Sequence, residues 1–376
     1  MLAPLAMTMN FYPWLRPLLF RMDSESAHRI AILSGQLLQS IPGLMRPENQ
    51  IVAPNPRLTT NVGGIPFETP LGLAAGFDKS GQVIPLMQSL GFGHLEIGSI
   101  SSRPSLGNPR PRLWRMIDHR GVLVHYGLPN DGAEHVAARL AKLQTRGILR
   151  KPLGINLVNT NDGPSVTPDS GAVIADYVQS ATLLAPFASY LMLNLSCPNT
   201  VDGRGFFETT GRIGELLQRI EKLSLNPPLL LKVSPDWDDH QFDQLIETAL
   251  ESPSVAGLML NLSAKQRDVL GSAQSRWSNY PGAVAGAPIK AWMNERTAWL
   301  YQKTKSTRLR LLSAGGIESA NDVWQRMESG ASLVQLYTAL IYEGPRLVRQ
   351  INRLLASRLE KEGVNNVADI VGTNAG

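Results

Sequence analysis

The sequence predicts an α/β protein, a (β/α)8 TIM barrel preceded by an N-terminal helical extension. Short apolar runs alternate with helical patterns along most of the 376 residues. Each run ends in glycine or in small or polar residues rather than in another strand, which is typical of a parallel sheet. Eight such runs alternate with helices, which is the pattern of a barrel whose reactive groups lie at the carboxyl ends of its strands.

Composition and charge agree with a folded protein of this size. With 376 residues, the chain is long enough for one large domain or two ordinary ones. Its content of 43% hydrophobic and 18% charged residues excludes disorder and collagen-like repeats. The net charge is +5, but no block of like charges marks a nucleic-acid-binding tail. We therefore expect a mildly anionic partner, such as a phosphate ligand or a membrane surface, and no nucleic acid.

The predicted strands are the eight apolar runs. They span residues 70–76, 94–100, 153–158, 190–196, 229–234, 257–263, 309–315 and 332–338. The predicted helices span residues 83–90, 133–145, 172–186, 213–223, 241–251, 295–304, 320–328 and 345–361. Asp239 is the expected cap of the fifth helix, and Ser319 with Asp322 begins the seventh. The last helix places on one side Leu347, Ile351, Leu354, Leu355 and Leu359.

Two connections are too long for simple turns, and both follow strands on the face where an active site is expected. They span residues 101–130 and 264–293. Long loops at this face of a barrel usually cover or shape a site. We expect them to do so here.

The first 60 residues precede the barrel and contain an amphipathic stretch at residues 26–38, with Ile30, Leu33 and Leu37 at helical spacing. It is interpreted either as a helix packed against the barrel or as a helix at a membrane surface. The apolar N-terminal run is interrupted by Pro13, Arg16 and Pro17, so it does not predict a membrane span. No signal peptide is indicated, and a cytoplasmic protein is expected.

Polar residues gather at the predicted strand ends. They are Asp78, Lys79, Ser99, Asn156, Asn194, Ser196, Cys197, Lys232, Asn261, Gly315, Gly316, Tyr337 and Thr338. Two lysines without matching carboxylates at neighbouring strand ends favour an anionic ligand. The ends of strands seven and eight are where such barrels often hold a phosphate group, so we expect a phosphorylated cofactor or substrate there.

Cys197 is the one cysteine of the chain, which excludes an intrachain disulfide and a cysteine-based zinc site. The six histidines show no metal-ligand spacing either, and no metal is predicted. A lone cysteine is usually an inert buried residue, but one at a strand end is a candidate base or nucleophile. The sequence shows no histidine and aspartate or asparagine partners for a cysteine hydrolase, so proton abstraction is the favoured role.

Longer segments around these strand ends form one set. They are Leu71-Gly-Leu-Ala-Ala-Gly-Phe-Asp-Lys79, Leu95-Glu-Ile-Gly-Ser99, Pro111-Arg-Leu-Trp-Arg115, Gly154-Ile-Asn156, residues 194–200, Leu231-Lys232-Val-Ser-Pro-Asp236, Gly315-Gly-Ile and Gly330-Ala-Ser-Leu-Val-Gln-Leu-Tyr337. Together they resemble the dihydroorotate dehydrogenase family, in its class 2, membrane-associated and quinone-linked type. The resemblance covers essentially the whole chain, and Phe11-Tyr-Pro with Ala27-His28 is similar to the family's quinone tunnel.

The resemblance implies an FMN-dependent oxidoreductase of pyrimidine biosynthesis, acting on a CH–CH group. It implies that residues 61–376 form the FMN-binding barrel and that residues 1–60 associate with quinone and with the inner face of the cell membrane. The FMN-binding residues would be Ala75, Gly76, Lys79, Ser99, Asn156, Asn194, Lys232, Asn261, Gly286, Gly315, Gly316, Tyr337 and Thr338. The resemblance also implies that a base removes a proton from the substrate while hydride passes to the flavin, and that quinone is reduced near His28 and Arg115.

The sequence also departs from the family pattern. Cys197 stands where class 2 members have a serine base, and a thiol can also act as a base. Of four family asparagines that hold the substrate, Asn194 and Asn199 remain, while Val124 and Leu262 replace the other two. The expected substrate pocket comprises Lys79, Val124, Asn194, Asn199, Leu262 and Ser263. Two alternatives therefore stand beside dihydroorotate oxidation: a less polar heterocyclic substrate in specialised metabolism, and a non-catalytic FMN-binding sensor.

Overall fold

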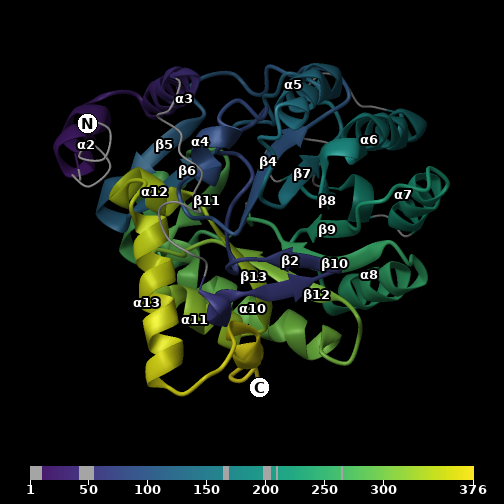
Figure 1. The fold of residues 1–376 in the computed structure, drawn as a ribbon. Helices are drawn as coiled ribbons and strands as arrows, with labels where there is room; N and C mark the ends of the chain where they lie inside the picture. The colour runs from purple at the N-terminus through teal and green to yellow at the C-terminus, as the bar shows by residue number, and fades with distance from the viewer. Residues whose placement is uncertain (1–10, 42–54, 164–168, 198–204, 209–210, 264–265) are drawn as a thin grey trace.

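The structure is a computed structural model that describes residues 11–41, 55–163, 169–197, 205–208, 211–263 and 266–376. Eight parallel strands close into a barrel in chain order, as predicted (Figure 1). The strands are β3 (Leu71–Leu73), β4 (His94–Ile100), β7 (Leu153–Leu157), β8 (Tyr190–Asn194), β9 (Leu229–Val233), β10 (Val255–Leu260), β12 (Arg310–Ala314) and β13 (Ala331–Leu336). Several predicted strands ran one to three residues too far, because the polar residues at their ends already belong to the site.

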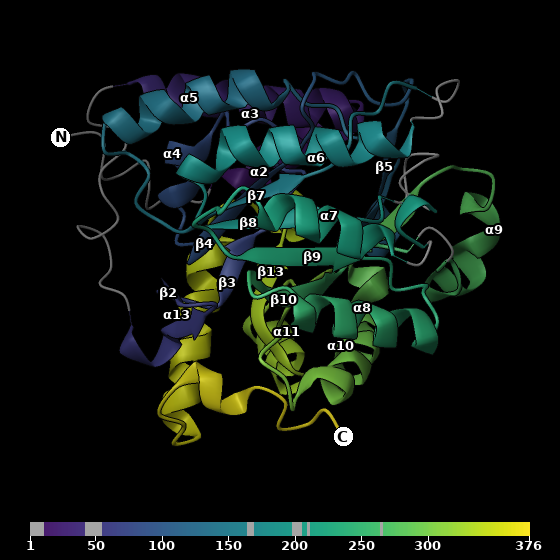
Figure 2. The same cartoon turned by 90° about the vertical axis from the view of Figure 1, so that its right-hand side faces the viewer.

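Helices surround the barrel (Figure 2). They are α4 (Ile84–Gln88), α5 (Ala133–Thr145), α6 (Ser170–Leu184), α7 (Arg212–Glu221), α8 (Asp239–Glu251), α10 (Lys290–Thr304), α11 (Ala320–Glu328), α12 (Thr338–Glu343) and α13 (Leu347–Lys361). Ser319 caps α11 as predicted, but the cap of α8 is Asp238 rather than Asp239, because Asp238 accepts the Gln241 N–H. Leu354 was also assigned wrongly, since it lies on the solvent side of α13 with 46% of its surface exposed.

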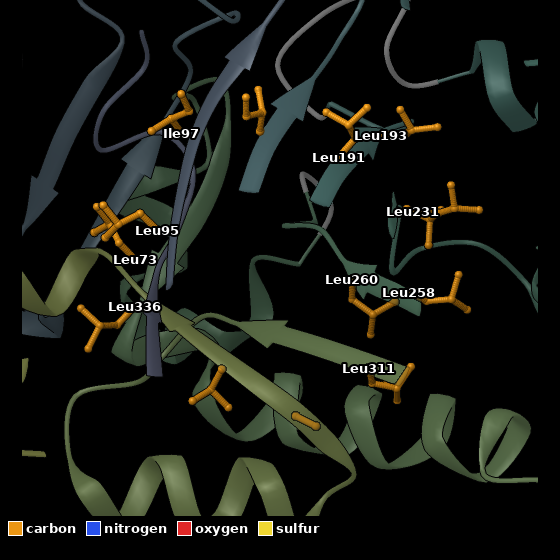
Figure 3. Close-up of a cluster of buried hydrophobic side chains, with 14 of the residues drawn as sticks. Leu73, Leu95, Ile97, Leu191, Leu193, Leu231, Leu258, Leu260, Leu311 and Leu336 are labelled. Atoms are coloured by element: carbon orange, nitrogen blue, oxygen red, sulfur yellow. The ribbon is translucent and has the colours of Figure 1, made fainter. Parts of the chain in front are cut away.

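The main core lies between the strands and the surrounding helices. Figure 3 shows leucine and isoleucine side chains projecting from the barrel strands in this layer. Those labelled are Leu73, Leu95, Ile97, Leu191, Leu193, Leu231, Leu258, Leu260, Leu311 and Leu336. Burial of each such side chain stabilises the fold by about 1.5–3 kcal/mol, so this layer fixes the strand ends that carry the site.

The inside of the barrel is filled in two parts. An apolar cluster includes Met192, Leu230 and Met259 together with Val62 and Phe67, which come from a hairpin of β1 (Thr60–Val62) and β2 (Ile65–Phe67). Polar side chains from β4, β7, β8 and β13 lie beside this cluster and are described below. Gly154 makes room for them, because a Cβ atom there would lie 2.1 Å from the ring of Tyr190.

The two long connections contain a small antiparallel sheet that the sequence did not predict. Its strands are β5 (Leu113–Met116), β6 (Gly121–Val124) and β11 (Ala283–Gly286), in the order β11-β6-β5. β5 and β6 come from the first long connection and β11 from the second. The connections therefore shape the active face, as expected, but they do so as a sheet rather than as loops.

The N-terminal helices are α2 (Tyr12–Arg21) and α3 (Ser24–Ser40), drawn in purple beside β5 and α12 in Figure 1. The Tyr12 hydroxyl donates to the carbonyl of Ile341 at 2.5 Å, and Arg16 donates to that of Tyr342 at 2.8 Å. The buried residues of α3 are Ile32 and Gly35. A Cβ atom at Gly35 would lie 2.9 Å from Val83, so this helix packs closely on the barrel.

The predicted apolar stripe of α3 does not make this contact. Ile30, Leu33 and Leu37 are exposed, the last by 66%. On α2, Trp14 is 81% exposed and Leu18 is 59% exposed. Within the residues described, no helix is long and apolar enough to cross a membrane.

Candidate active site

A cavity of about 180 Å³ lies at the carboxyl ends of the barrel strands and brings together most of the predicted site residues. Those that line it are Ala75, Gly76, Lys79, Ser99, Val124, Asn194, Cys197, Lys232, Asn261, Leu262, Gly286, Gly315, Gly316, Tyr337 and Thr338. They come from the ends of seven of the eight barrel strands, all except β7, and from the long connections, so the fold places residues far apart in sequence around one space. We call it the smaller cavity.

Two of the described residues that were predicted to bind FMN or substrate do not line this cavity. Asn156 lies behind the wall, where its Oδ1 accepts a hydrogen bond from Ser99 at 2.6 Å. Ser263 faces away, and its hydroxyl donates to Asp236 Oδ1 at 2.5 Å. Asn199 lies outside the described residues.

Lys79 is held at the cavity by a turn built on Asp78. The buried carboxylate of Asp78 accepts the backbone N–H of Gln82 at 2.7 Å and of Val83 at 2.8 Å. The ammonium of Lys79 lies 4.1 Å from the centre of the Tyr126 ring, a cation–π contact. Burial lowers the pKa of Lys79 to about 8, although Glu25 and Asp78 act in the opposite direction. Near neutral pH the cavity therefore still contains a cation.

Lys232 is the second lysine of the cavity. Burial lowers the pKa of this lysine, and the negative charges of Glu96 and Cys197 raise it. Glu96 does not lie at a strand end but points into the barrel from within β4, so the expectation about carboxylates at strand ends did not cover it. Cys197 is buried in the same wall, so a thiolate there would be stabilised by the Lys232 ammonium.

The turn after β12 is held from behind by Arg326, a fully buried arginine on α11. Its guanidinium donates to the carbonyls of Ala314 at 3.0 Å and of Gly315 at 2.8 Å. The turn needs glycine at position 316, where φ is +78° and a Cβ atom would lie 2.6 Å from Lys290 Cα. With these carbonyls bound to Arg326, the turn has a cation directly behind it, which favours an anion in front.

One side of the smaller cavity is largely apolar. Val124, Leu128, Pro129 and Leu262 line it, together with the ring of Tyr126. The Tyr126 hydroxyl is buried and has no hydrogen-bond partner among the described residues. This side therefore offers a bound molecule one hydroxyl and little else that is polar.

A larger cavity of about 1300 Å³ lies under α2 and α3 and contains the residues expected near quinone. His28 and Arg115 both line it, with apolar neighbours such as Leu15, Leu19 and Phe20. Arg115 donates to the carbonyl of Leu19 at 3.0 Å and to the Ser24 hydroxyl at 3.1 Å, so it holds the junction between the two helices.

The two cavities share walls. Tyr337 lines both of them. On β6, Val122 lines the larger cavity, whereas Val124 lines the smaller one. His28 packs edge-on against the Phe77 ring, with ring centroids 5.4 Å apart, and its Nε2 lies 3.3 Å from Lys79 Nζ.

Sequence reasoning missed three residues of the site, namely Glu96, Tyr126 and Arg326. Glu96 could have been found from strand alternation, because His94 and Glu96 share the inward face of β4. Tyr126 lies in a connection whose path the sequence pattern does not predict. Arg326 belongs to a helix that otherwise reads as a solvent-facing amphipathic segment, so no local signal marks it.

Comparison with known proteins gives the same relationship over the whole chain. The family model described as dihydroorotate dehydrogenase matches residues 57–359. A dihydroorotate dehydrogenase (quinone) from Novosphingobium aromaticivorans is 35% identical over 97% of this chain and 100% of its own length. One from Thermobifida fusca is 36% identical over 95% of this chain and 94% of its own. The crystal structure of DHODH from Eimeria tenella in complex with ferulenol superposes with a TM-score of 0.81 at 26% identity, covering 93% of this chain and 95% of the other.

Proposed function

Because this chain belongs to the dihydroorotate dehydrogenase family, we propose that it oxidises dihydroorotate to orotate and passes the electrons to a quinone. The observation that carries the proposal is the convergence of Lys79, Asn194, Cys197 and Lys232 on one cavity at the strand ends. A second, mostly apolar cavity adjoins it and shares Tyr337 with it. One cavity suits a polar anionic substrate and the other suits a hydrophobic acceptor.

We propose FMN as the flavin, bound in the smaller cavity. The residues present fit such a group, since Lys232 donates no hydrogen bond to the described residues and Gln335 Oε1 is buried without a partner there. Gly315 and Gly316 with the Thr338 hydroxyl would hold its phosphate, in front of the Arg326 cation. FMN, when bound, would accept a hydride from the substrate and later give electrons to quinone.

The chain's own residues supply binding and proton transfer. Lys79 would attract the carboxylate of dihydroorotate, and the Asn194 amide would hydrogen-bond the ring. Cys197 Sγ would remove the proton from the substrate carbon, with the Lys232 ammonium stabilising the thiolate that must be present beforehand. Asn199 stays a proposed substrate residue on the strength of the family pattern alone.

Quinone would bind in the larger cavity, beside His28 and Arg115. Burial and the Lys79 charge hold the pKa of His28 well below its ordinary value, so the imidazole is neutral. Trp14, Leu18, Leu33 and Leu37 are exposed around this part of the molecule. We propose that this apolar surface of α2 and α3 makes a peripheral membrane contact through which quinone enters.

The relatives do not favour the two alternatives, a different heterocyclic substrate and a sensor without catalysis. With dihydroorotate as the substrate, Val124 and Leu262 provide fewer hydrogen bonds to it than asparagines at these two positions would. Each lost hydrogen bond costs about 0.5–1.5 kcal/mol, so we expect a substrate affinity lower than that of a pocket with four asparagines.

The test is an anaerobic visible spectrum of the purified protein before and after dihydroorotate, followed by a soluble quinone analogue. We expect the flavin absorption to bleach with dihydroorotate and to return with the quinone. A protein that binds no flavin even after reconstitution would refute the proposal. A flavin that dithionite reduces and quinone reoxidises, but that dihydroorotate leaves oxidised, would refute the assigned substrate.

A further inference from the structure

A carboxylate lies at the centre of the barrel, where apolar side chains normally pack. Glu96 on β4 is fully buried, as are Asn156 and Gln335 beside it. Three donors meet its two oxygens: Asn156 Nδ2 at 2.9 Å, the Tyr190 hydroxyl at 2.9 Å and Gln335 Nε2 at 2.9 Å. Burying a charge in a core is costly unless it is paired, so this residue calls for a functional reason.

The hydrogen bond from Asn156 is the last of a chain that begins at the smaller cavity. Because a carboxylate only accepts, Asn156 must turn its Nδ2 toward Glu96 and its Oδ1 away. That Oδ1 accepts from the Ser99 hydroxyl at 2.6 Å and from Asn194 Nδ2 at 3.4 Å. Asn194 Nδ2 also lies 3.3 Å from Ser99 Oγ. Glu96 therefore sets the orientation of two residues that line the cavity.

The chain continues one residue further and ends at a fixed donor. Asn194 Oδ1 accepts from Asn261 Nδ2 at 3.0 Å, and Asn261 Oδ1 accepts the backbone N–H of Leu262 at 2.9 Å. Every donor in the chain thus points toward Glu96. A backbone N–H at one end and a carboxylate at the other allow only this direction, so the amide groups cannot flip.

Glu96 also acts on the cavity through charge. It lies close enough to Lys232 to raise the pKa of that lysine against the effect of burial. His94 and Tyr190 share its surroundings, but burial lowers the pKa of His94 to about 3 and raises that of Tyr190, so both are neutral. Glu96 is therefore a negative charge beneath the wall that contains Lys232.

We propose that Glu96 is a positioning residue for the flavin: it orients Asn156, Ser99 and Asn194 through the hydrogen-bonded chain and balances the charge of Lys232. The inference rests on the proposed flavin site. It predicts that substitution of Glu96 changes how the flavin is held and how easily it is reduced, although Glu96 itself does not line the cavity.

Two variants separate the roles. Glu96→Gln keeps an acceptor for Asn156 and removes the charge, so we expect a more positive flavin midpoint potential with flavin affinity nearly unchanged. Glu96→Leu removes the acceptor as well, so we expect the Kd of FMN to rise about tenfold or more, with a shifted visible spectrum. Potentiometric titration and FMN rebinding to the apoprotein measure these effects.

Tyr190→Phe is the matched control. It removes a different hydrogen bond to the same carboxylate and leaves the hydrogen-bonded chain to the cavity intact. Thermal stability should therefore fall. The Kd of FMN should stay within twofold of the parent value, and the flavin midpoint potential should be unchanged within error. Equal changes in FMN affinity and midpoint potential in Tyr190→Phe and in the Glu96 variants would show that Glu96 has only a structural role. Folded Glu96 variants with unchanged affinity, spectrum and potential would overturn the inference, whereas a parent protein that binds no flavin would overturn the proposed function instead.

Discussion

Lys79 Nζ lies 3.3 Å from His28 Nε2, so one hydrogen bond joins the wall of the smaller cavity to that of the larger cavity. The neutral imidazole accepts from the ammonium, and it also bonds to the backbone of Phe77. Lys79, which lines the smaller cavity, is therefore held in place by a residue that lines the larger one. Its charge state and its partner each give a testable consequence.

Orotate binding should weaken as Lys79 loses its proton. Since burial lowers its pKa to about 8, the ammonium is present below that pH and absent above it. Flavin difference spectra at constant ionic strength should show a steady Kd from about pH 6 to 7 and a rise approaching tenfold per pH unit above about 8. Glu25, Asp78 and Arg112 shape this titration, and the variant Lys79→Gln should not show it. An unchanged rise in that variant would assign it to another group.

Replacing His28 should affect the quinone half-reaction most. In His28→Leu, we expect reoxidation of the flavin by decylubiquinone to slow about tenfold, while reduction by dihydroorotate changes by less than about threefold. Stopped-flow absorbance separates the two steps. Leu15→Ala is the control, because Leu15 lines the same cavity and no contact joins it to Lys79. Equal slowing of both steps in His28→Leu would contradict this division of roles.

Cys197 should be required for reduction of the flavin by substrate. Cys197→Ala should slow that step by at least about 100-fold with flavin content unchanged, because the proton has no acceptor. Cys197→Ser should keep part of the activity, with its pH profile moved upward, since a hydroxyl is a weaker acid than a thiol. Anaerobic stopped-flow measurements across pH 6 to 10 test both. Full activity in Cys197→Ala would remove the residue from the mechanism.

Amides at positions 124 and 262 should strengthen orotate binding. With one new hydrogen bond each, Val124→Asn and Leu262→Asn together should lower the Kd about tenfold, as measured by flavin difference spectra. Alanine at both positions provides the control, because it removes the apolar side chains without adding donors. Tighter binding in the alanine variant would show that space, not hydrogen bonding, limits affinity.

The exposed residues of α2 should determine membrane contact. Trp14→Asp with Leu18→Asp should reduce co-sedimentation with anionic vesicles several-fold, because both side chains are largely exposed and apolar. Activity with a short-chain, soluble quinone should remain, since the substituted side chains do not line the larger cavity. Unchanged vesicle binding would place the membrane contact elsewhere on the molecule.

The barrel was predictable because its strands are apolar runs that end in polar residues. The same pattern located most of the cavity wall, since parallel strands bring their carboxyl ends to one edge. Boundaries failed where a polar residue belongs to the site rather than to the strand, as at Asn261 and Thr338. The stripe of Ile30, Leu33 and Leu37 does lie on a helix, but it does not pack on the barrel, because apolar periodicity shows that a helix has an apolar face and not what covers it.

Contacts that depend on tertiary structure could not be predicted from the sequence. The sheet of β5, β6 and β11 pairs segments about 160 residues apart, such as Val124 with Ala283. Arg326 and Glu96 act from behind the wall, on partners that only the closed barrel supplies. The hydrogen bond between Lys79 and His28 joins the barrel to the N-terminal helices, and no spacing in the sequence encodes it.

Strand β6 carries Val122 and Val124 on one face, two residues apart, and each faces a different cavity. A substitution at position 124 alters the lining of the smaller cavity and leaves that of the larger cavity unchanged, while one at position 122 does the reverse. Two adjoining cavities can therefore change their linings independently in evolution, each through a single substitution in the same short strand.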